Sequence, residues 1–329
     1  MEAIWNSGIA FIVLFQSLGE WLVTPMKFFS FLGSEEFFLL SLPLLYWSVD
    51  TGLGLRVGII FLFSGSVNSF LKLGLRGPRP YWYSTLVKAY SMETSFGVPS
   101  GHAQIAMSLW GMIAAVLKRQ WAWLAAIFIV LMIGLSRLFL AVHFPHDVLM
   151  GWVIGALILW AFARFWHPVS AWANKKSFGQ QIGLAFAASL VLLICGVIPF
   201  GTLQGWDLPV NWLANIQQAG FDELPAPVSL DSTITFAAVM FGMFAGVAWM
   251  NLRGGYEASG SGKQRILRLL PGMLGIVIIY LGLRAIFPQG DTFTAYLLRY
   301  LRYALIGLWV TAGGPWIFQK MKLAKNQGI

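Results

Sequence analysis

Long apolar stretches alternate with short polar connections along most of this 329-residue chain. A helix needs about 17–25 mostly apolar residues to cross a bilayer core that is about 30 Å thick. Stretches of this kind occur at about 35–50, 55–75, 101–117, 121–141, 147–165, 181–200, 231–251, 267–286 and 295–317. The pattern therefore predicts an all-α polytopic membrane protein with about nine spans.

The first 34 residues have a different pattern. They are apolar, but Glu20, Pro25 and Lys27 interrupt them. Such a segment is better suited to lie in the membrane interface than to cross it in one helix. We therefore predict N-terminal interfacial helices at 1–34, a transmembrane core at 35–200, and a C-terminal transmembrane extension of about three helices at 201–329.

Composition agrees with this class of protein. Hydrophobic residues make up 58% of the chain and charged residues 11%, and the mean hydropathy is +0.71. The net charge of +9 is of the kind seen in nucleic-acid-binding proteins, but a membrane protein collects Lys and Arg in its cytoplasmic loops. We therefore expect membrane lipids around the protein and no nucleic-acid partner.

The distribution of charge predicts an orientation. With the N-terminus outside, the inside connections carry most of the cations: Arg56, Lys118, Arg119, Arg164, Lys175, Lys176, Arg253, Lys263, Arg265, Arg268, Lys320, Lys322 and Lys325. The opposite side holds the acids Asp207, Asp222, Glu223, Asp231 and Asp291. This positive-inside bias places the C-terminus in the cytoplasm. Two groups of cations break the rule by falling on the outer side: Lys72, Arg76, Arg79, Lys88 and Arg137 in the predicted core, and Arg284, Arg299 and Arg302 in the extension.

Three polar stretches share this outer side: KLGLRGPRP at 72–80, GVPSGHAQ at 97–104 and SRLFLAVHFPHD at 136–147. Together they supply several cations and a serine and glycine at a helix start. Helix N-termini bind phosphate through unpaired N–H groups, and arginine adds paired donors that match phosphate oxygens. Histidines beside such groups can act as nucleophile and general acid. The residues therefore predict phosphoryl transfer at a membrane surface.

The same stretches resemble the three-part signature of the type 2 phosphatidic acid phosphatase (PAP2) superfamily. The three parts are Lys72-x6-Arg79-Pro80, Pro99-Ser100-Gly101-His102 and Ser136-Arg137-x5-His143-x3-Asp147. All three are complete and in order. The resemblance implies a membrane phosphatase whose six-helix core covers about 35–200.

The resemblance also implies a role for each matched residue. His143 attacks phosphorus and forms a phosphohistidine, Asp147 orients His143, and His102 protonates the leaving oxygen. Five positions hold the phosphoryl oxygens: Lys72, Arg79, Ser100, Gly101 and Arg137. It implies no metal and no cofactor. The spacing selects His143 over His146, which is expected to be a structural or substrate-adjacent neighbour.

Four further residues are candidates for contacting the substrate. Glu93 precedes the second motif and either contacts a substrate hydroxyl or pairs with Arg76 or Lys88, the pairing being favoured. Asn68 lies one helical turn before Lys72 and is expected to steady it.

The other two candidates are Arg299 and Arg302, three residues apart on one helix face in the extension. Pairing with Asp222, Glu223 or Asp291 is slightly favoured for them. The alternative is that they attract anionic substrate or lipid headgroups.

The substrate class divides into alternatives. A lipid phosphate or pyrophosphate is expected first, because its tail stays in the bilayer while its phosphate reaches the site. Three features are similar to the glucose-6-phosphatase branch: the number of spans, RPYW at 79–82 and ETSFGVPSGH at 93–102. This similarity makes a soluble sugar phosphate the second expectation. That branch carries glutamine where this chain has Asp147. A lipid phosphotransferase and a non-catalytic transporter are further alternatives. The expected location is a bacterial inner membrane, with the catalytic site on its outer side.

Overall fold

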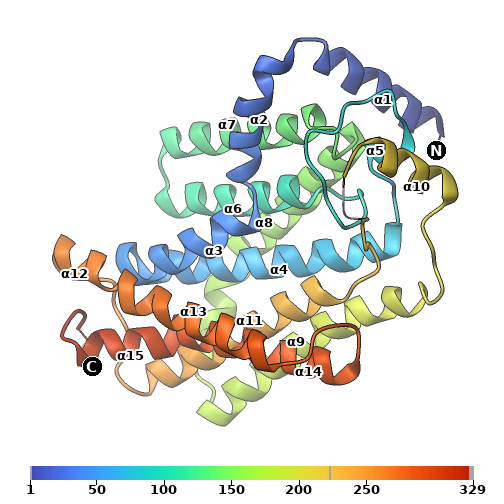
Figure 1. The fold of residues 1–329 in the computed structure, drawn as a ribbon. Helices are drawn as coiled ribbons and strands as arrows, with labels where there is room; N and C mark the ends of the chain where they lie inside the picture. Colours follow the sequence, from blue (N-terminus) through green and yellow to red (C-terminus); the bar gives the residue numbers. More distant parts are fainter. Residues whose placement is uncertain (1, 222–223, 326–329) are drawn as a thin grey trace. The chain divides into compact units, whose positions relative to one another are not determined.

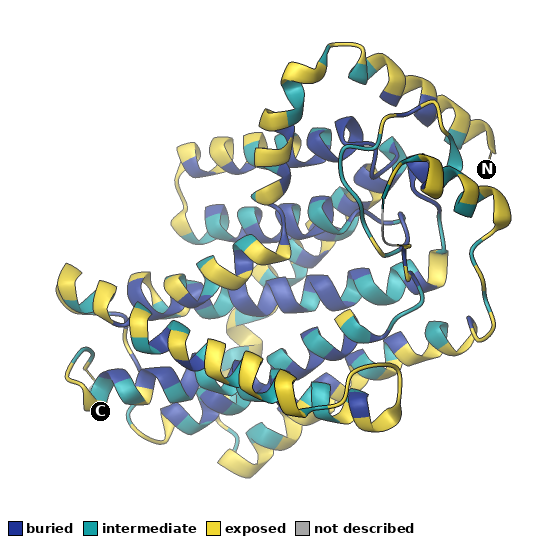
Figure 2. Ribbon diagram, viewed as in Figure 1, coloured by how far each residue is buried: buried dark blue, intermediate teal, exposed yellow. Residues whose placement is uncertain are grey.

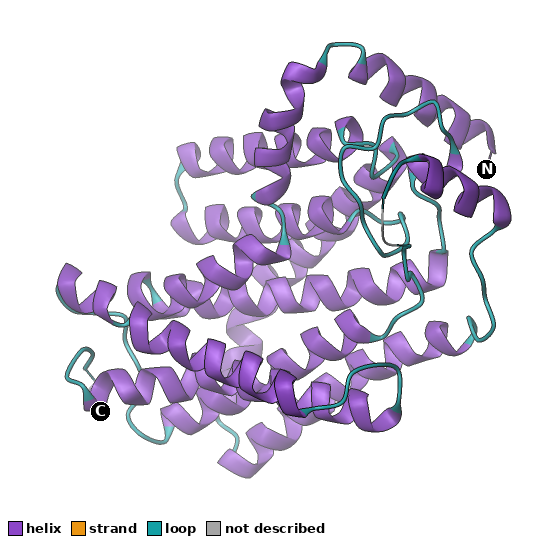
Figure 3. Cartoon of the chain, viewed as in Figure 1, coloured by secondary structure: helices purple, strands orange, loops and turns teal. Residues whose placement is uncertain are grey.

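The computed structural model describes residues 2–221 and 224–325 of the chain. Within these ranges the chain forms helices and loops and no strand, as Figure 3 shows. The prediction of an all-α protein is confirmed. The helices before the first motif are α1 (Glu2–Gln16), η1 (Glu20–Leu22), α2 (Val23–Phe31), α3 (Glu35–Leu44) and the π-helical turn η2 (Leu45–Val49).

The remaining helices follow in chain order in Figure 1. The core contains α4 (Thr51–Leu75), α5 (Pro80–Tyr83), α6 (Gly101–Leu117), α7 (Gln120–Phe139), α8 (Pro145–Asn174) and α9 (Phe178–Gly201). The C-terminal part contains α10 (Val210–Gln218), α11 (Asp231–Asn251), α12 (Gly262–Leu267), α13 (Leu269–Ile286), α14 (Phe293–Leu308), η3 (Trp309–Gly313) and α15 (Gly314–Lys320).

The predicted spans coincide with helices, and two of them, 101–117 and 231–251, have the bounds of α6 and α11. Local signals explain why α6 starts and ends where it does. The Ser100 hydroxyl caps its N-terminus by accepting a hydrogen bond from the Ala103 N–H, and Lys118 ends it with a left-handed backbone at φ 52°. The helix predicted at 147–165 is longer than expected, because α8 continues through Pro168 to Asn174.

The number of spans is smaller than predicted. In the described part of the chain, six helices are long and apolar enough to cross a membrane: α4 with α5, α7, α8, α9, α11, and α12 with α13. A seventh span exists if α1 and α2, which meet at an angle of 93°, are counted as one broken span. The predicted stretches at 35–50 and 295–317 are not among these six helices, and the stretch at 101–117 forms the shorter apolar helix α6, whose 17 residues reach only the lower end of the length needed to span.

The chain forms two compact units that are interleaved in sequence. The first contains residues 1–38, 67–163 and 196–230, and the second contains 39–66, 164–195 and 231–329. In the first unit, α8 crosses the start of α6 through the small residues of a Gly-x-x-x-Gly pair. A Cβ added to Gly151 would lie 2.6 Å from the Ser100 carbonyl oxygen, and one added to Gly155 would collide with the Gln104 carbonyl. This close contact holds the start of α6 against α8.

In the second unit, α11 and α14 pack through small residues. A Cβ on Gly242 would collide with the Ala304 carbonyl, and a Cβ on Gly307 would collide with the Val239 carbonyl. In both units large apolar side chains remain exposed on helices whose opposite faces are buried (Figure 2). Leu124 and Val153 are 63% and 60% exposed in the first unit, and Leu270 is 74% exposed in the second. These outward faces fit a lipid environment.

Candidate active site

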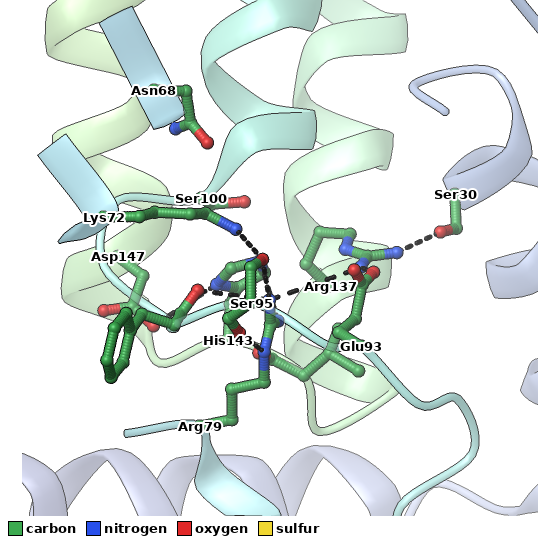
Figure 4. Close-up of polar contacts among 12 residues, drawn as sticks. Ser30, Asn68, Lys72, Arg79, Glu93, Ser95, Ser100, Arg137, His143 and Asp147 are labelled. Atoms are coloured by element: carbon green, nitrogen blue, oxygen red, sulfur yellow. Dashed lines mark hydrogen bonds and ion pairs between the residues drawn. The ribbon is translucent and has the colours of Figure 1, made fainter. Parts of the chain in front are cut away.

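The three polar motifs converge within the first unit, as Figure 4 shows. Lys72 lies in the last turn of α4, and Arg79 precedes α5 as its N-cap residue. Ser100 is the N-cap residue of α6, Arg137 lies in the last turn of α7, and Asp147 lies in the first turn of α8. The sequence prediction that these segments meet is in agreement with the described geometry.

The tight turn between α7 and α8 positions the predicted nucleophile. Ala141 adopts a left-handed backbone with φ 57°, and the N–H groups of Val142 and His143 both donate to the Arg137 carbonyl oxygen at 3.2 and 3.3 Å. The next helix begins at Pro145, where a missing N–H costs nothing. His143 is therefore held two residues before α8, directly beside the last turn of α7.

The two nitrogens of His143 face different partners. Nδ1 lies 3.4 Å from Asp147 Oδ2, and Nε2 lies 3.4 Å from Arg79 Nη1. The same Asp147 oxygen accepts a hydrogen bond of 2.9 Å from the Phe144 N–H, which fixes the carboxylate. His143 and Asp147 are 1% and 0% exposed. Burial, followed by the Arg79 and Arg137 charges, lowers the pKa of His143 well below its ordinary value, so the ring is neutral.

His146 is the second partner of Asp147. Its Nε2 lies 3.2 Å from Asp147 Oδ1, and its ring stacks on Phe144 with centroids 5.3 Å apart. One third of its side chain is exposed. The Asp147 carboxylate thus lies between two histidines, of which only His143 faces an arginine of the cluster.

Ser95 joins two of the predicted phosphate-binding cations, and sequence reasoning did not select it. Its Oγ accepts a hydrogen bond of 2.7 Å from Lys72 Nζ and one of 3.1 Å from Arg79 Nη2. Arg79 is also anchored through Nε to the Ser95 carbonyl at 2.7 Å and through Nη1 to the Val142 carbonyl at 2.9 Å. A serine two residues after Glu93, in the loop between the first two motifs, was the sequence signal for this contact.

Glu93 forms an ion pair, but with a different partner from those predicted. Its carboxylate pairs with Arg137 through Oε1, and its Oε2 lies 3.9 Å from Arg79 Nη2. The prediction of Arg76 or Lys88 is wrong because each of these has another partner: Arg76 donates to Thr202, and Lys88 pairs with Glu20.

The electrostatic balance at Glu93 follows from these contacts. Burial alone would raise its pKa, but Arg137 and Arg79 outweigh that effect and hold the pKa below its usual value. Arg137 also donates to the Ser30 hydroxyl from the end of α2. The two arginines that lie beside His143 thus share one ionised carboxylate.

Asn68 contacts the start of α6, although the sequence analysis expected it to contact Lys72. Asn68 Nδ2 donates to the Pro99 carbonyl at 3.2 Å and to Gln104 Oε1 at 3.0 Å. A Cβ on Gly101 would lie 2.9 Å from Asn68 Oδ1, so glycine permits this approach. The predicted Asn68–Lys72 contact is therefore replaced by one to the α6 start.

His102 follows Gly101, is partly exposed, and makes no side-chain hydrogen bond to the described residues.

Helix α10, which was not predicted from the sequence, supports the motif segment that carries Arg79. Asn215 Nδ2 donates to the Trp82 carbonyl at 2.9 Å, and the Trp82 and Trp212 rings lie 6.0 Å apart. The amphipathic pattern of VNWLANIQQ at 210–218 was the available signal.

Arg299 and Arg302 belong to α14 in the second unit, whereas the cluster around His143 belongs to the first. Arg299 pairs with Asp231 at 2.9 Å, so the favoured pairing with an acid occurs, but with a different acid. Asp222 and Glu223 lie outside the described residues. Asp291 accepts a hydrogen bond from the Tyr296 hydroxyl at 2.9 Å.

The cluster combines a neutral histidine, a carboxylate behind it and three cations in front of it. A phosphoryl group carries its negative charge on oxygens that match paired arginine donors, and a neutral imidazole is a competent nucleophile toward phosphorus. The fold and the site are therefore those expected of an integral membrane protein that acts on a phosphate group.

Comparisons with known proteins agree with this class. The sequence profile of the PAP2 superfamily matches residues 53–170, and the profile of the PAP2 superfamily phosphatase transmembrane extension matches residues 234–326. Glucose-6-phosphatase 3 of Bos taurus is 30% identical and the Homo sapiens protein of that name is 28% identical, each alignment covering 95% or more of both chains. A PAP2-type phosphatidylglycerolphosphate phosphatase from Bacillus subtilis aligns with a TM-score of 0.44 at 24% identity, covering 51% of this chain and 87% of that one.

The chain belongs to the PAP2 superfamily and is a membrane phosphatase that carries the transmembrane extension of that superfamily. The superfamily is metal-independent. Within it, the chain is a distant homologue of the glucose-6-phosphatases over nearly its full length.

Proposed function

We propose that this phosphatase hydrolyses a phosphate monoester through a phosphohistidine at His143. The observation that carries the proposal is the pair of contacts made by the His143 ring. Nδ1 faces the Asp147 carboxylate, and Nε2 faces Arg79. An Nδ1–H that donates to Asp147 leaves a lone pair on Nε2, which points to the side where a phosphate would meet Arg79. Nε2 is therefore the attacking atom.

The reaction has two steps. In the first, His143 Nε2 forms a bond to phosphorus while the bond from phosphorus to the leaving oxygen breaks. His102, which takes up a proton together with the anionic substrate, gives that proton to the leaving oxygen. In the second, water attacks the phosphohistidine, His102 takes a proton from the water, and the P–N bond breaks to release phosphate. Asp147 stabilises the positive charge that develops on the His143 ring in the first step.

The cations provide the electrostatic part of the catalysis. Lys72, Arg79 and Arg137 face the phosphoryl oxygens, and Gly101, the first residue of α6, adds an N–H group at a helix N-terminus, whereas the Ser100 N–H already donates to the Asp147 carbonyl at 3.0 Å. In the unliganded protein Glu93 partly neutralises Arg137 and Arg79. A substrate phosphate therefore has to share or displace this carboxylate when it binds.

For the substrate, we propose a soluble sugar phosphate as the first class to test. The relatives named as glucose-6-phosphatases align over nearly the whole chain, including the extension, and this supports the sugar phosphate that the sequence analysis placed second. A lipid phosphate, expected first from the sequence, becomes the second candidate, and Asp147 favours it. The glucose-6-phosphatase branch carries glutamine at this position, whereas the wider superfamily carries aspartate.

The chain is an integral membrane protein, and we propose that the catalytic cluster and the N-terminus lie on the outer side of a bacterial inner membrane. The distribution of Lys and Arg along the connections supports this orientation. A cysteine introduced at Ser84, in the loop beside the cluster, should react with an impermeant maleimide in intact cells. One introduced at Ser177, between α8 and α9, should react only after lysis. The reverse pattern would exclude the proposed orientation.

The function is tested by phosphate release from purified protein in detergent. The panel contains glucose 6-phosphate, phosphatidate, phosphatidylglycerophosphate and undecaprenyl pyrophosphate. We expect the highest kcat/KM for glucose 6-phosphate and loss of all release in His143→Ala, with His146→Ala as the matched control that retains activity. Full activity of His143→Ala would refute the mechanism, and a strong preference for phosphatidate would select the lipid candidate.

The same preparation separates hydrolysis from the remaining alternatives. Added glycerol intercepts a phosphohistidine if alcohols reach it, so glycerol phosphate formed at the expense of free phosphate would indicate a phosphotransferase. A non-catalytic transporter would release no phosphate from any member of the panel.

A further inference from the structure

A polar cavity of about 250 Å³ lies in the second unit, among the ends of three extension helices. Its lining includes Asp231 at the start of α11, the loop that follows α13, and Ala295 and Arg302 in α14. Helices α11 and α14 both begin here, so the positive ends of two helix dipoles are close to the cavity. None of these residues belongs to the catalytic cluster.

Arg302 is the unusual member of this lining. It is 3% exposed, and its Nε is sealed from solvent without a hydrogen-bond partner. Within the described ranges it makes no ion pair and no hydrogen bond. A buried cation without a counter-ion costs several kcal/mol unless something else compensates it.

Two tyrosines hold the Arg302 guanidinium in place. Its central carbon lies 5.6 Å from the centroid of the Tyr280 ring and 5.0 Å from that of Tyr303, and these rings are 6.3 Å apart. Cation–π contacts offset part of the burial cost, but they leave the N–H donors unused. Arg302 thus presents an ordered guanidinium with free donors at the edge of the cavity.

The neighbouring acids are engaged elsewhere. Asp231 pairs with Arg299 Nη1 at 2.9 Å, and Arg299 also donates through Nε to Thr235 at 3.2 Å. Asp291 accepts from the Tyr296 hydroxyl. Arg302 therefore has no carboxylate of its own, although two aspartates line the same cavity.

We propose that this cavity binds a phosphate group, with Arg302 as the main donor and Arg299 as the second. Guanidinium donors match phosphate oxygens in pairs, and the ligand would supply the missing counter-ion. The cavity is smaller than the roughly 300–1,000 Å³ of pockets that enclose drug-sized ligands, so it suits a single phosphate-bearing headgroup or a free phosphate ion. The phosphate comes either from a membrane lipid or from solution.

The test measures binding to the full-length protein in detergent, in a His143→Ala background that prevents turnover. The probes are dioctanoyl phosphatidate and inorganic phosphate, each titrated while thermal unfolding is followed by tryptophan fluorescence. Arg302→Gln is compared with the matched control Arg253→Gln, an exposed arginine that follows α11 in the second unit and is not part of the cavity lining. The catalytic cluster is the same in both variants, so a difference between them reports on this cavity.

We expect Arg302→Gln to weaken the binding of at least one probe by about tenfold or more, the effect of losing one charge-assisted hydrogen bond, while Arg253→Gln matches the parent. A loss confined to phosphatidate assigns the site to a lipid headgroup, and a loss for inorganic phosphate assigns it to the free ion. Equal affinities in Arg302→Gln and the parent for both probes would overturn the proposal.

A second variant keeps the test valid if Arg302→Gln fails to fold. Gln289→Glu adds a negative charge of nearly the same shape to an exposed position in the lining. It should weaken binding of the affected probe several-fold through repulsion while the protein remains folded. Unchanged binding in this variant would also contradict a phosphate site in the cavity.

Discussion

Replacement of Asp147 by asparagine tests the proposed catalytic geometry most directly. The change keeps the size of the side chain and leaves an oxygen that can accept from the Phe144 N–H, which now lies 2.9 Å from Oδ2. It removes the negative charge that faces His143 Nδ1 at 3.4 Å. An amide can also turn its NH2 group toward Nδ1, which would place the ring proton on Nε2 and remove the attacking lone pair.

The magnitude follows from the hydrogen bond that is lost. A charged acceptor contributes about 1.5–3 kcal/mol to such a bond, and each 1.36 kcal/mol corresponds to a tenfold change in rate. We therefore expect kcat to fall about 10- to 150-fold, and further if the wrong tautomer dominates. KM should change little, because Asp147 lies behind the nucleophile and does not face the phosphate.

The assay is the initial rate of phosphate release at several substrate concentrations, with size-exclusion chromatography to verify that each variant is folded. His146→Asn is the matched control, since His146 contacts the other oxygen of the same carboxylate at 3.2 Å. We expect that control to retain kcat within about threefold. A kcat of Asp147→Asn within twofold of the unmodified protein, or a larger loss in His146→Asn, would refute the assignment of His143 as the oriented nucleophile.

Three further predictions concern packing, charge and pH. Gly151→Ala should lower both the unfolding temperature and kcat, because its Cβ would lie 2.6 Å from the Ser100 carbonyl oxygen and such overpacking costs about 1–3 kcal/mol. The control Gly183→Ala, whose Cβ would meet nothing within 4 Å, should lower neither of them. Glu93→Gln should tighten product inhibition by phosphate about tenfold, since a competing carboxylate is removed, and a weaker inhibition would show that Glu93 assists binding. Because the pKa of His143 is lowered, the residual kcat/KM of Asp147→Asn, in which no carboxyl faces the ring, should not fall with a group titrating at pH 6.5 as the pH decreases, once the ionisation of the substrate phosphate near pH 6 is taken into account. An acid limb at 6.5 in that variant would contradict a buried, neutral nucleophile.

The positions of the apolar helices were predictable from sequence because hydrophobic length alone determines them. Two helices, α6 and α11, have the predicted bounds. Their ends occur at polar or capping residues such as Ser100, the N-cap residue of α6. The count of spans was less predictable. Whether an apolar stretch forms one long helix or two shorter ones depends on packing, as at α14, which passes into the π-helical turn η3.

The catalytic motifs were visible in the sequence because their spacing is local. The contacts that set their charge were not, because they join distant residues. Glu93 meets Arg137 across 44 positions, and Ser95 meets Lys72 across 23, through a loop without regular structure. No periodicity reports how such a loop folds, so the sequence indicated an ion pair for Glu93 but not its partner.

The buried arginines of this chain show how the surroundings of a cation indicate its role. Arg268 is fully buried, and its donors are used by the main-chain carbonyls of Trp47, Ser259 and Leu323. Carbonyls of the fold cannot be exchanged for a ligand, so this arginine is structural. Arg137 is satisfied by the carboxylate of Glu93, a side chain that can move when a phosphate arrives. Arg302 is held by aromatic rings, which compensate its charge but leave its donors open. The nature of the counter-group, rather than burial alone, therefore separates Arg268, which holds the fold, from Arg302, for which we propose an anion. Arg79 combines the two cases, because main-chain carbonyls hold its Nε and Nη1 while its Nη2 donates to the Ser95 hydroxyl, a group that can turn away from it.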